Sequence, residues 1–226
     1  MDYILTANHI DRIFPTKAGD FKALSDISLT IPKGKLTILR GRSGSGKTTL
    51  LNILGALDYP TSGEVLLDGQ DIAKLSDSAR ASLRRTDIGF VFQSIALIPM
   101  MTAFENVDFE LRLAKYAGDR KERVMECLRL VGLQQRAGHY PQELSGGEQQ
   151  RIAIAQAIAH HPKILFADEP TGALDTASGL SVVKIFKDLC EKAGVTIVMT
   201  THDVGLMEFG DAVYELEGGE LVHGEA

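Results

Sequence analysis

Residues 36–48 read LTILRGRSGSGKT, and no other segment constrains the architecture of the chain so strongly. A short apolar run, Leu36 to Leu39, leads into a glycine-rich loop that matches the pattern G-x-x-x-x-G-K-[ST]. Apolar residues then recur at helical spacing: Leu50, Ile53, Leu54 and Leu57. A glycine-rich loop between a strand and a helix allows backbone N–H groups to surround phosphates. The segment predicts an α/β fold with a parallel sheet and a phosphate-binding loop.

Each residue of this loop is a candidate ligand of a nucleotide. The candidates are Gly41, Arg42, Ser43, Gly44, Ser45, Gly46, Lys47, Thr48 and Thr49. Lys47 can reach the terminal phosphates as a point charge, and the Thr48 hydroxyl can ligate Mg²⁺. The alternative is a Gly/Ser-rich turn without a ligand, but the strand and helix on either side favour nucleotide binding.

A second motif, residues 164–169, is an apolar strand that ends in two carboxylates, Asp168 and Glu169. Ligands of open parallel sheets bind at the carboxyl ends of the strands, so these acids should lie beside the phosphate loop. Asp168 suits a water-mediated role in holding Mg²⁺, and Glu169 suits polarising an attacking water. A solvated turn or a helix cap is the alternative interpretation of such an acidic pair.

The octapeptide LSGGEQQR, residues 144–151, is the third motif. Ser145 and Glu148 have the spacing of a capping box, which explains both residues as the start of a helix. The capping box does not explain Gly146 and Gly147, since a glycine inside a helix costs about 1 kcal/mol. Glycines fit where an anion approaches the backbone closely, so Ser145, Gly146, Gly147 and Glu148 are candidate phosphate ligands.

The remaining pattern alternates strands with helices, which indicates crossover connections in a parallel sheet. Expected strands are Ile27–Ile31, Gly63–Gly69, Ile88–Phe92, Thr196–Met199 and Ala212–Val222. Expected helices begin at a capping box, Thr102 to Glu105, and cover Asp119–Val131 and Thr176–Lys192. We expect one domain, 1–226, with a nucleotide-binding lobe (1–93 and 161–226) and an inserted helical lobe (94–160).

Composition excludes several classes of function. The 226 residues carry 24 Lys and Arg against 30 Asp and Glu, a net charge of −6 with no basic block, which disfavours a nucleic-acid partner. Cys127 and Cys190 lack metal-ligand spacing and are expected to be buried thiols in a reducing compartment. No apolar run approaches the roughly 18 residues of a membrane span, and the first ten residues lack a signal-like core. We therefore expect a cytosolic protein that reaches a membrane only through a partner.

The three motifs together resemble the ATPase subunits of ABC transporters along nearly the whole chain. The resemblance implies a RecA-like P-loop core, an antiparallel β subdomain and an inserted α-helical subdomain that carries LSGGEQQR. It implies ATP and Mg²⁺ as ligands and a head-to-tail homodimer. In that dimer Ser145 and Gly147 of one subunit would contact the γ-phosphate held by the loop of the other.

The resemblance also implies roles for four residues that carry little signal alone. Gln93 would reach Mg²⁺ and the attacking water, and His202 would contact the γ-phosphate and orient the water. Asp175 would lie at the dimer interface, although it could simply cap the helix that begins at Thr176. Phe14 is the best counterpart of an adenine-stacking aromatic, although it could equally be a core residue.

An apolar segment follows Gln93 in the sequence, and the region from Gln93 to Met101 is the expected docking site of a membrane permease subunit. The alternative is that this segment packs beneath a neighbouring helix. The sequences DEPTGALD (168–175), NILGALDYPTSGEV (52–65) and IGFVFQ (88–93) resemble the branch that serves macrolide, lipoprotein, antimicrobial-peptide and haem export. That branch implies ATP-driven export or extraction at the cytoplasmic face of a bacterial membrane. The alternatives are an ATPase for mechanotransmission or signalling, and a repair-type ATPase, which the acidic composition disfavours.

Adjacent histidines, His160 and His161, are expected near the C-terminal end of the LSGGEQQR helix, where cationic side chains are tolerated.

Overall fold

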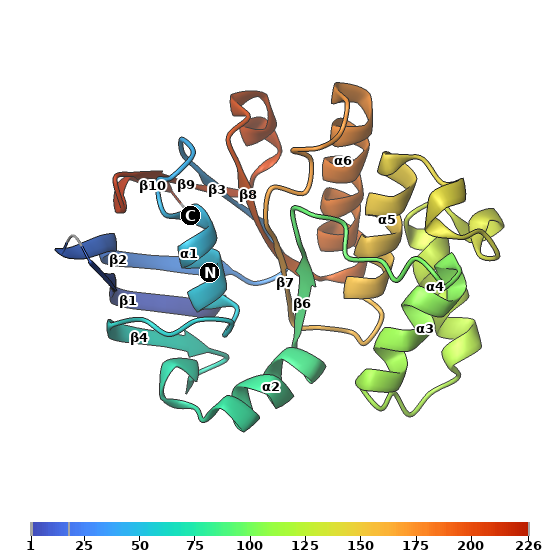
Figure 1. Ribbon diagram of the computed structural model, residues 1–226, viewed down its shortest axis with the longest axis horizontal. Helices are drawn as coiled ribbons and strands as arrows, with labels where there is room; N and C mark the ends of the chain where they lie inside the picture. The colour runs from blue at the N-terminus through green and yellow to red at the C-terminus, as the bar shows by residue number, and fades with distance from the viewer. Residues whose placement is uncertain (1, 18, 226) are drawn as a thin grey trace.

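Two β-sheets and a group of helices form the molecule (Figure 1), and the computed structural model describes residues 2–17 and 19–225. The larger sheet has the order β10-β9-β3-β8-β7-β6. Its strands are β3 (Leu36–Arg40), β6 (Ile88–Val91), β7 (Ile164–Ala167), β8 (Thr196–Thr201), β9 (Ala212–Glu217) and β10 (Glu220–Glu225). Only the β9–β10 pair in this sheet is antiparallel. The phosphate loop therefore leaves β3 in the interior of a mostly parallel sheet.

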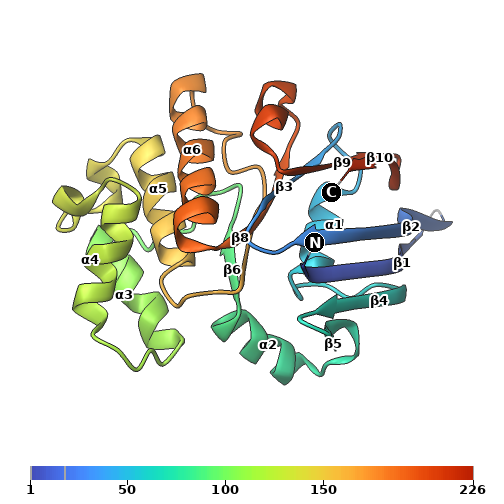
Figure 2. The ribbon, with the colours of Figure 1, turned by 180° about the vertical axis from the view of Figure 1, so that it is seen from behind.

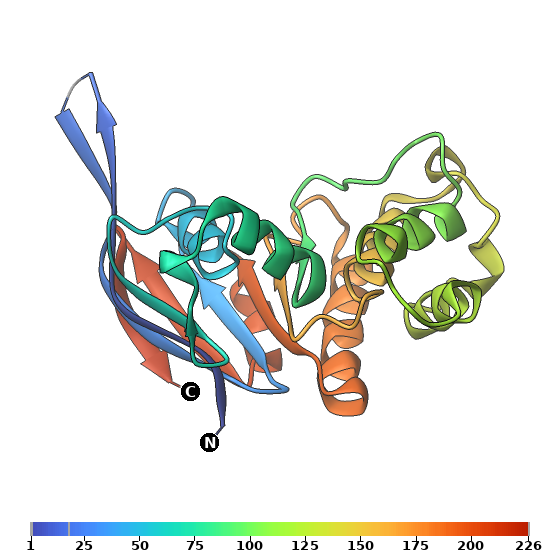
Figure 3. The ribbon, with the colours of Figure 1, turned by 90° about the horizontal axis from the view of Figure 1, so that it is seen from below.

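The smaller sheet is antiparallel, in the order β2-β1-β4-β5. Its strands are β1 (Tyr3–Thr16), β2 (Gly19–Pro32), β4 (Ser62–Leu67) and β5 (Gln70–Asp71). The helices are α1 (Lys47–Leu54), α2 (Asp77–Thr86), α3 (Ala103–Leu113), α4 (Arg120–Leu130), α5 (Gly146–Ala157) and α6 (Thr176–Ala193). The helices α3, α4 and α5 lie at the opposite end of the molecule from β1, β2 and β4, as both the rear view (Figure 2) and the view from below (Figure 3) show.

The central strands β3, β7 and β8 are buried on both faces of the sheet, so they are mostly apolar rather than alternating. Leu39 and Phe166 face one hydrophobic cluster, shared with α1 and the antiparallel sheet. Ile38 and Leu165 face the other, shared with α3, α4, α5 and α6. The sheet thereby links the phosphate loop mechanically to the helical lobe.

Local signals fix the starts of the helices in this lobe. Thr102 and Glu105 form the expected capping box of α3, and Asp119 caps α4. Arg123 of α4 donates hydrogen bonds to the carbonyl oxygens of Ile158 and Ala159, at 2.8 and 2.9 Å, just beyond α5. A buried guanidinium thus satisfies carbonyls at a helix C-terminus and joins α4 to α5.

The predicted α/β class with a parallel sheet, an antiparallel sheet and helices is confirmed, and two element predictions are wrong. Leu57 does not belong to α1, which stops at Gly55; the Leu57 N–H donates to the Asn52 carbonyl and its side chain is 41% exposed. Residues 212–222 are not one strand, because Gly218 and Gly219, at φ 57° and 86°, form the two-residue turn of the β9–β10 hairpin. The strand β1 and the helix α2 were not predicted from the sequence.

Both cysteines are buried free thiols in α4 and α6, as expected. Within the described residues, no helix has the length and apolar character needed to cross a membrane.

Candidate functional site

The loop between β3 and α1 needs glycine at two positions. Gly46 has φ 102°, and a Cβ there would lie 2.8 Å from the Ala23 carbonyl oxygen. A Cβ on Gly41 would lie 2.3 Å from the carbonyl oxygen of Leu216. The loop is therefore wedged between β2 and β9, which holds its backbone in place before any ligand arrives.

Lys47 lies inside this loop. Its side chain is 4% exposed, and its ammonium donates to the carbonyl oxygens of Gly41 and Arg42 at 2.9 and 3.1 Å. The same ammonium is 3.5 Å from Oε1 of Glu169. A cation placed at the centre of a ring of backbone groups can meet an entering phosphate.

Oxygen donors gather beside the loop at the ends of β7 and β8. The Thr48 hydroxyl donates to Oδ1 of Asp168 at 3.1 Å, and the Thr200 hydroxyl donates to the same oxygen at 2.7 Å. The Thr200 hydroxyl also accepts the Glu169 N–H at 2.8 Å. A hydroxyl and a carboxylate are the ligand types that Mg²⁺ prefers, so these residues fit that ion.

Thr200 is a residue of this site that the sequence did not predict. The signal available was its place at the carboxyl end of β8, next to β7 in a parallel sheet, where polar side chains meet ligands. Threonine is common in strands, so its presence alone predicted nothing.

Glu169 adopts φ 42°, a left-handed conformation that is unusual for a residue other than glycine. Its carbonyl accepts the Gly172 N–H at 3.0 Å, and its Oε2 lies 3.3 Å from Nδ1 of His202. The carboxylate therefore sits between the Lys47 ammonium and an imidazole that is 62% exposed. Strained backbone of this kind concentrates at functional sites, and a carboxylate beside a phosphate loop can orient a water molecule.

A cavity of about 520 Å³ opens beside these groups. Residues from the phosphate loop, together with Glu169 and His202, line it. The Arg40 guanidinium and the Glu215 carboxylate, also in the lining, pair with each other. The cavity thus leaves open space next to the phosphate loop, beside the Glu169 carboxylate and the His202 imidazole.

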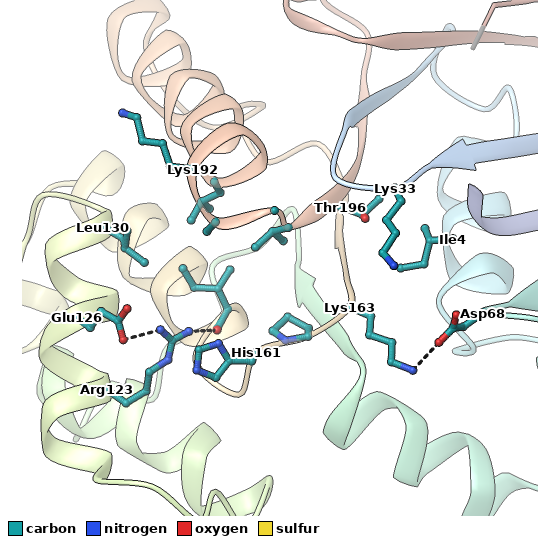
Figure 4. A pocket seen from close by; sticks show the side chains of 16 residues that line it. Ile4, Lys33, Asp68, Arg123, Glu126, Leu130, His161, Lys163, Lys192 and Thr196 are labelled. Carbon is teal, nitrogen blue, oxygen red and sulfur yellow. Dashed lines mark hydrogen bonds and ion pairs between the residues drawn. The ribbon is translucent and has the colours of Figure 1, made fainter. Parts of the chain in front are cut away.

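A cavity of about 580 Å³ lies elsewhere, between α4 and the ends of β1 and β8 (Figure 4). Four of its charged groups pair with one another: Lys163 donates to Asp68 at 2.8 Å, and Arg123 donates to Glu126 at 2.8 Å. None of the predicted site residues lines this cavity. We therefore assign no part of the nucleotide site to it.

The LSGGEQQR residues lie in the helical lobe, away from the phosphate loop. Ser145 caps α5, its hydroxyl accepts the Glu148 N–H at 3.3 Å, and Gly146 and Gly147 occupy the first turn. A Cβ on Gly147 would lie 3.0 Å from the Ser178 hydroxyl of α6, so the two helix starts are in contact. Among the described residues, no hydrogen bond or ion pair joins residues 145–148 to residues 41–49.

Asp175 caps α6, accepting the N–H of Ser178 at 3.0 Å and its hydroxyl at 2.7 Å. These bonds hold the pKa of Asp175 below its usual value. The cap explains Asp175 structurally and leaves its implied place at a dimer interface as a prediction.

Two further candidate site residues, Phe14 and Gln93, lie outside this group of interacting side chains. Phe14 is half-buried on β1 opposite Phe21, with the Arg12 guanidinium 4.3 Å from its ring centre, and it belongs to neither hydrophobic cluster. Gln93 is exposed just after β6, and within the described chain its side chain makes no hydrogen bond. One copy of the chain therefore brings together the phosphate loop, Asp168, Glu169 and His202. The candidates that remain outside this group are Phe14, Gln93, Asp175 and residues 145–148.

Comparison with known proteins identifies the family of this chain. A family model described as "ABC transporter" matches residues 24–172. The chain belongs to the ABC transporter family. It is 46% identical over 205 residues to the ABC transporter ATP-binding protein MJ0796 of Methanocaldococcus jannaschii, covering 88% of this chain and 87% of that one. It is 41% identical over 222 residues to the macrolide export ATP-binding/permease protein MacB of Bartonella henselae, covering 98% of this chain but 34% of MacB.

Solved structures give the same result for this ABC ATPase. The dimeric structure of the MJ0796 cassette matches with a TM-score of 0.89 at 41% identity, over 98% of this chain and 97% of that one. A second structure of that cassette, a post-hydrolysis state bound to ADP and Pi, matches with a TM-score of 0.89 at 40% identity. The chain is thus an ATP-binding subunit of the family, and it hydrolyses ATP.

Proposed function

We propose that two copies of this chain close head to tail over two ATP molecules. Each site would combine the phosphate loop (residues 41–49) of one copy with Ser145, Gly146, Gly147 and Glu148 of the other. The observation that carries this proposal is the separation of the two phosphate-binding motifs into different lobes of one copy. The dimeric form of the MJ0796 cassette supports it.

Within each site, Lys47 would bind the terminal phosphates, and Thr48, Asp168 and Gln93 would hold Mg²⁺. When bound, Mg²⁺ neutralises charge on the phosphates. Glu169 polarises the attacking water, and His202 orients it against the γ-phosphate. The short contacts from Glu169 to Lys47 and His202 support these roles.

Adenine would stack on Phe14. Its half-buried ring, outside both hydrophobic clusters, favours this role over that of a core residue. Asp175 would meet the partner subunit at the edge of the site while also capping α6. The domain would divide into the two lobes expected from the sequence, with residues 94–160 moving as the helical lobe.

A separate membrane permease subunit would dock on residues 93–101 and hold the ATPase at the cytoplasmic face of the membrane. The side chain of Met100 is 86% exposed, whereas Leu97 packs partly against the hydrophobic cluster. Export or extraction of a peptide, lipoprotein, macrolide or haem type of substrate is the transport we propose, by analogy with relatives such as MacB. The second candidate, a mechanotransmission complex that moves nothing, shares the same ATPase chemistry.

Met100→Glu is the sharpest test of docking. We expect the variant to keep its melting temperature and ATP affinity and to lose recruitment to vesicles that contain the permease, because a charge replaces an exposed apolar contact. Normal recruitment would place the docking surface elsewhere. Reconstituted complexes assayed for ATP-dependent substrate movement across vesicles separate export from mechanotransmission, since only an exporter accumulates substrate.

A further inference from the structure

An apolar groove of about 250 Å³ runs between the two lobes, next to the docking segment. Leu57, Phe90, Phe92 and Ala96 line it on one side, and Ala153 and Ala157 of α5 line it on the other. Phe90 and Phe92 stack with their ring centres 5.5 Å apart, and Phe92 remains 44% exposed. The groove therefore offers an apolar floor that continues directly from residues 93–101.

Four polar side chains interrupt this apolar lining, and one of them is an acid, Glu110 of α3; the others are Arg84, Gln156 and His160. Its side chain is 21% exposed, and burial raises its pKa with no nearby cation acting against that rise. Within the described part of the chain, no hydrogen bond reaches its carboxylate. Arg84, which also lines the groove, donates instead to the Ala56 carbonyl at 2.6 Å.

His160, the nearest titratable neighbour, does not compensate this acid. Its Nε2 lies 3.2 Å from the Ile88 carbonyl oxygen, which requires the proton on Nε2. Its Nδ1 is buried without a hydrogen-bond partner, 3.6 Å from Oε1 of Glu110. His160 lies just beyond the C-terminal end of α5, as expected, but burial lowers its pKa and favours the neutral ring. The Nδ1 lone pair of His160 therefore faces the Glu110 carboxylate, and this ring nitrogen donates no hydrogen bond to it.

We propose that Glu110 pairs with a lysine or arginine of the membrane subunit that docks beside this groove. The inference rests on the proposed docking of a permease at residues 93–101 and adds the charge that the permease must carry. A half-buried carboxylate in an apolar groove is costly alone and becomes favourable once a cation from the partner pairs with it. The apolar lining would provide contact area, and Glu110 would select the partner and fix its register.

Charge replacement at Glu110 tests the proposal in detergent-solubilised complexes of the ATPase and its membrane subunit. Glu110→Gln keeps the shape and should weaken the affinity for the membrane subunit at least about tenfold. Glu110→Lys should abolish complex formation. Changing the lysines and arginines of the permease's cytoplasmic loops one at a time to Glu should identify one position that restores binding to Glu110→Lys.

Glu122→Lys is the matched control, since Glu122 is exposed on α4 of the same lobe and lies outside the groove; it should bind like the native chain. Thermal unfolding of each variant verifies that the lobe is folded. Native affinity for both Glu110 variants would overturn the proposal, as would loss of binding by Glu110→Lys alone with no restoring position. Failure of the native chain to bind the membrane subunit would instead overturn the proposed docking itself.

Discussion

Single side chains at the ends of β7 and β8 organise the chemistry of this site. Thr200 does not line the cavity, yet its hydroxyl donates to Asp168 and accepts the Glu169 N–H. Glu169, held in a left-handed conformation, turns its carboxylate toward Lys47 and His202. One threonine thus sets the positions of both acids.

Replacing Thr200 by Val keeps the shape and removes both hydrogen bonds. Leaving buried polar groups without partners costs about 1–3 kcal/mol, so we expect a lower free energy of unfolding and a reduced kcat. Thr200→Ser keeps the hydroxyl and should recover most of the free energy of unfolding and most of kcat. Denaturant unfolding and ATPase assays over a range of Mg²⁺ concentrations measure the effect; a Val variant as active as the Ser variant would remove the positioning role.

Glu169→Gln keeps the size and loses the charge. Because positioned carboxylates of this kind contribute about 10²- to 10⁴-fold to rate, we expect kcat to fall by that range while ATP still binds. Size-exclusion chromatography with ATP should then show a trapped dimer. Turnover near the native rate would assign the water to another group.

At the scale of elements, the start of α5 satisfies two demands at once. Its capping box accounts for Ser145 and Glu148, and hydrogen bonds from the Ser145 backbone and hydroxyl keep the pKa of Glu148 below its usual value. The two glycines of its first turn are not needed by the cap. Gly147 meets α6 closely, so a structural explanation, close helix packing, competes with the proposed contact to a phosphate.

Gly147→Ala separates these explanations when it is combined with Ser178→Gly. Alanine raises helix propensity by about 1 kcal/mol, but its Cβ would lie 3.0 Å from the Ser178 hydroxyl. We expect Gly147→Ala to lose ATPase activity, and the double variant to regain melting temperature without regaining activity. Ser178→Gly alone is the matched control. Recovery of both properties would show that Gly147 serves helix packing only.

Local patterns predicted the elements whose signals are contiguous in sequence. The strand, loop and helix around Lys47 and the capping boxes at Thr102 and Ser145 depend on neighbours a few residues away. Burial of His160 could not be predicted, because the surrounding groups come from α3 and β6. The β9–β10 hairpin had a local signal, Gly218-Gly219, that the reading of 212–222 as one strand overlooked.

At the scale of the whole molecule, the phosphate loop and the LSGGEQQR motif lie on different groups of elements. The ends of β3 and β7 carry the phosphate loop and both acids, whereas α5 carries LSGGEQQR and α3 carries Glu110. The parallel sheet and α6 connect them through one continuous hydrophobic cluster. Packed side chains therefore connect α5 to the segment beside the groove.

Mixing two inactive variants tests whether catalysis belongs to the pair. Lys47→Ala should abolish nucleotide binding in its own loop, and Gly147→Ala should spoil the site of the opposite subunit. In a mixed dimer both defects fall in one site, and the other site is intact, so random pairing should restore about a quarter of native sites. Single-turnover release of the γ-phosphate, measured before and after mixing, reports the intact sites directly. Each variant mixed with itself gives the baseline, and a mixture no more active than that baseline would show that each copy carries a complete site of its own.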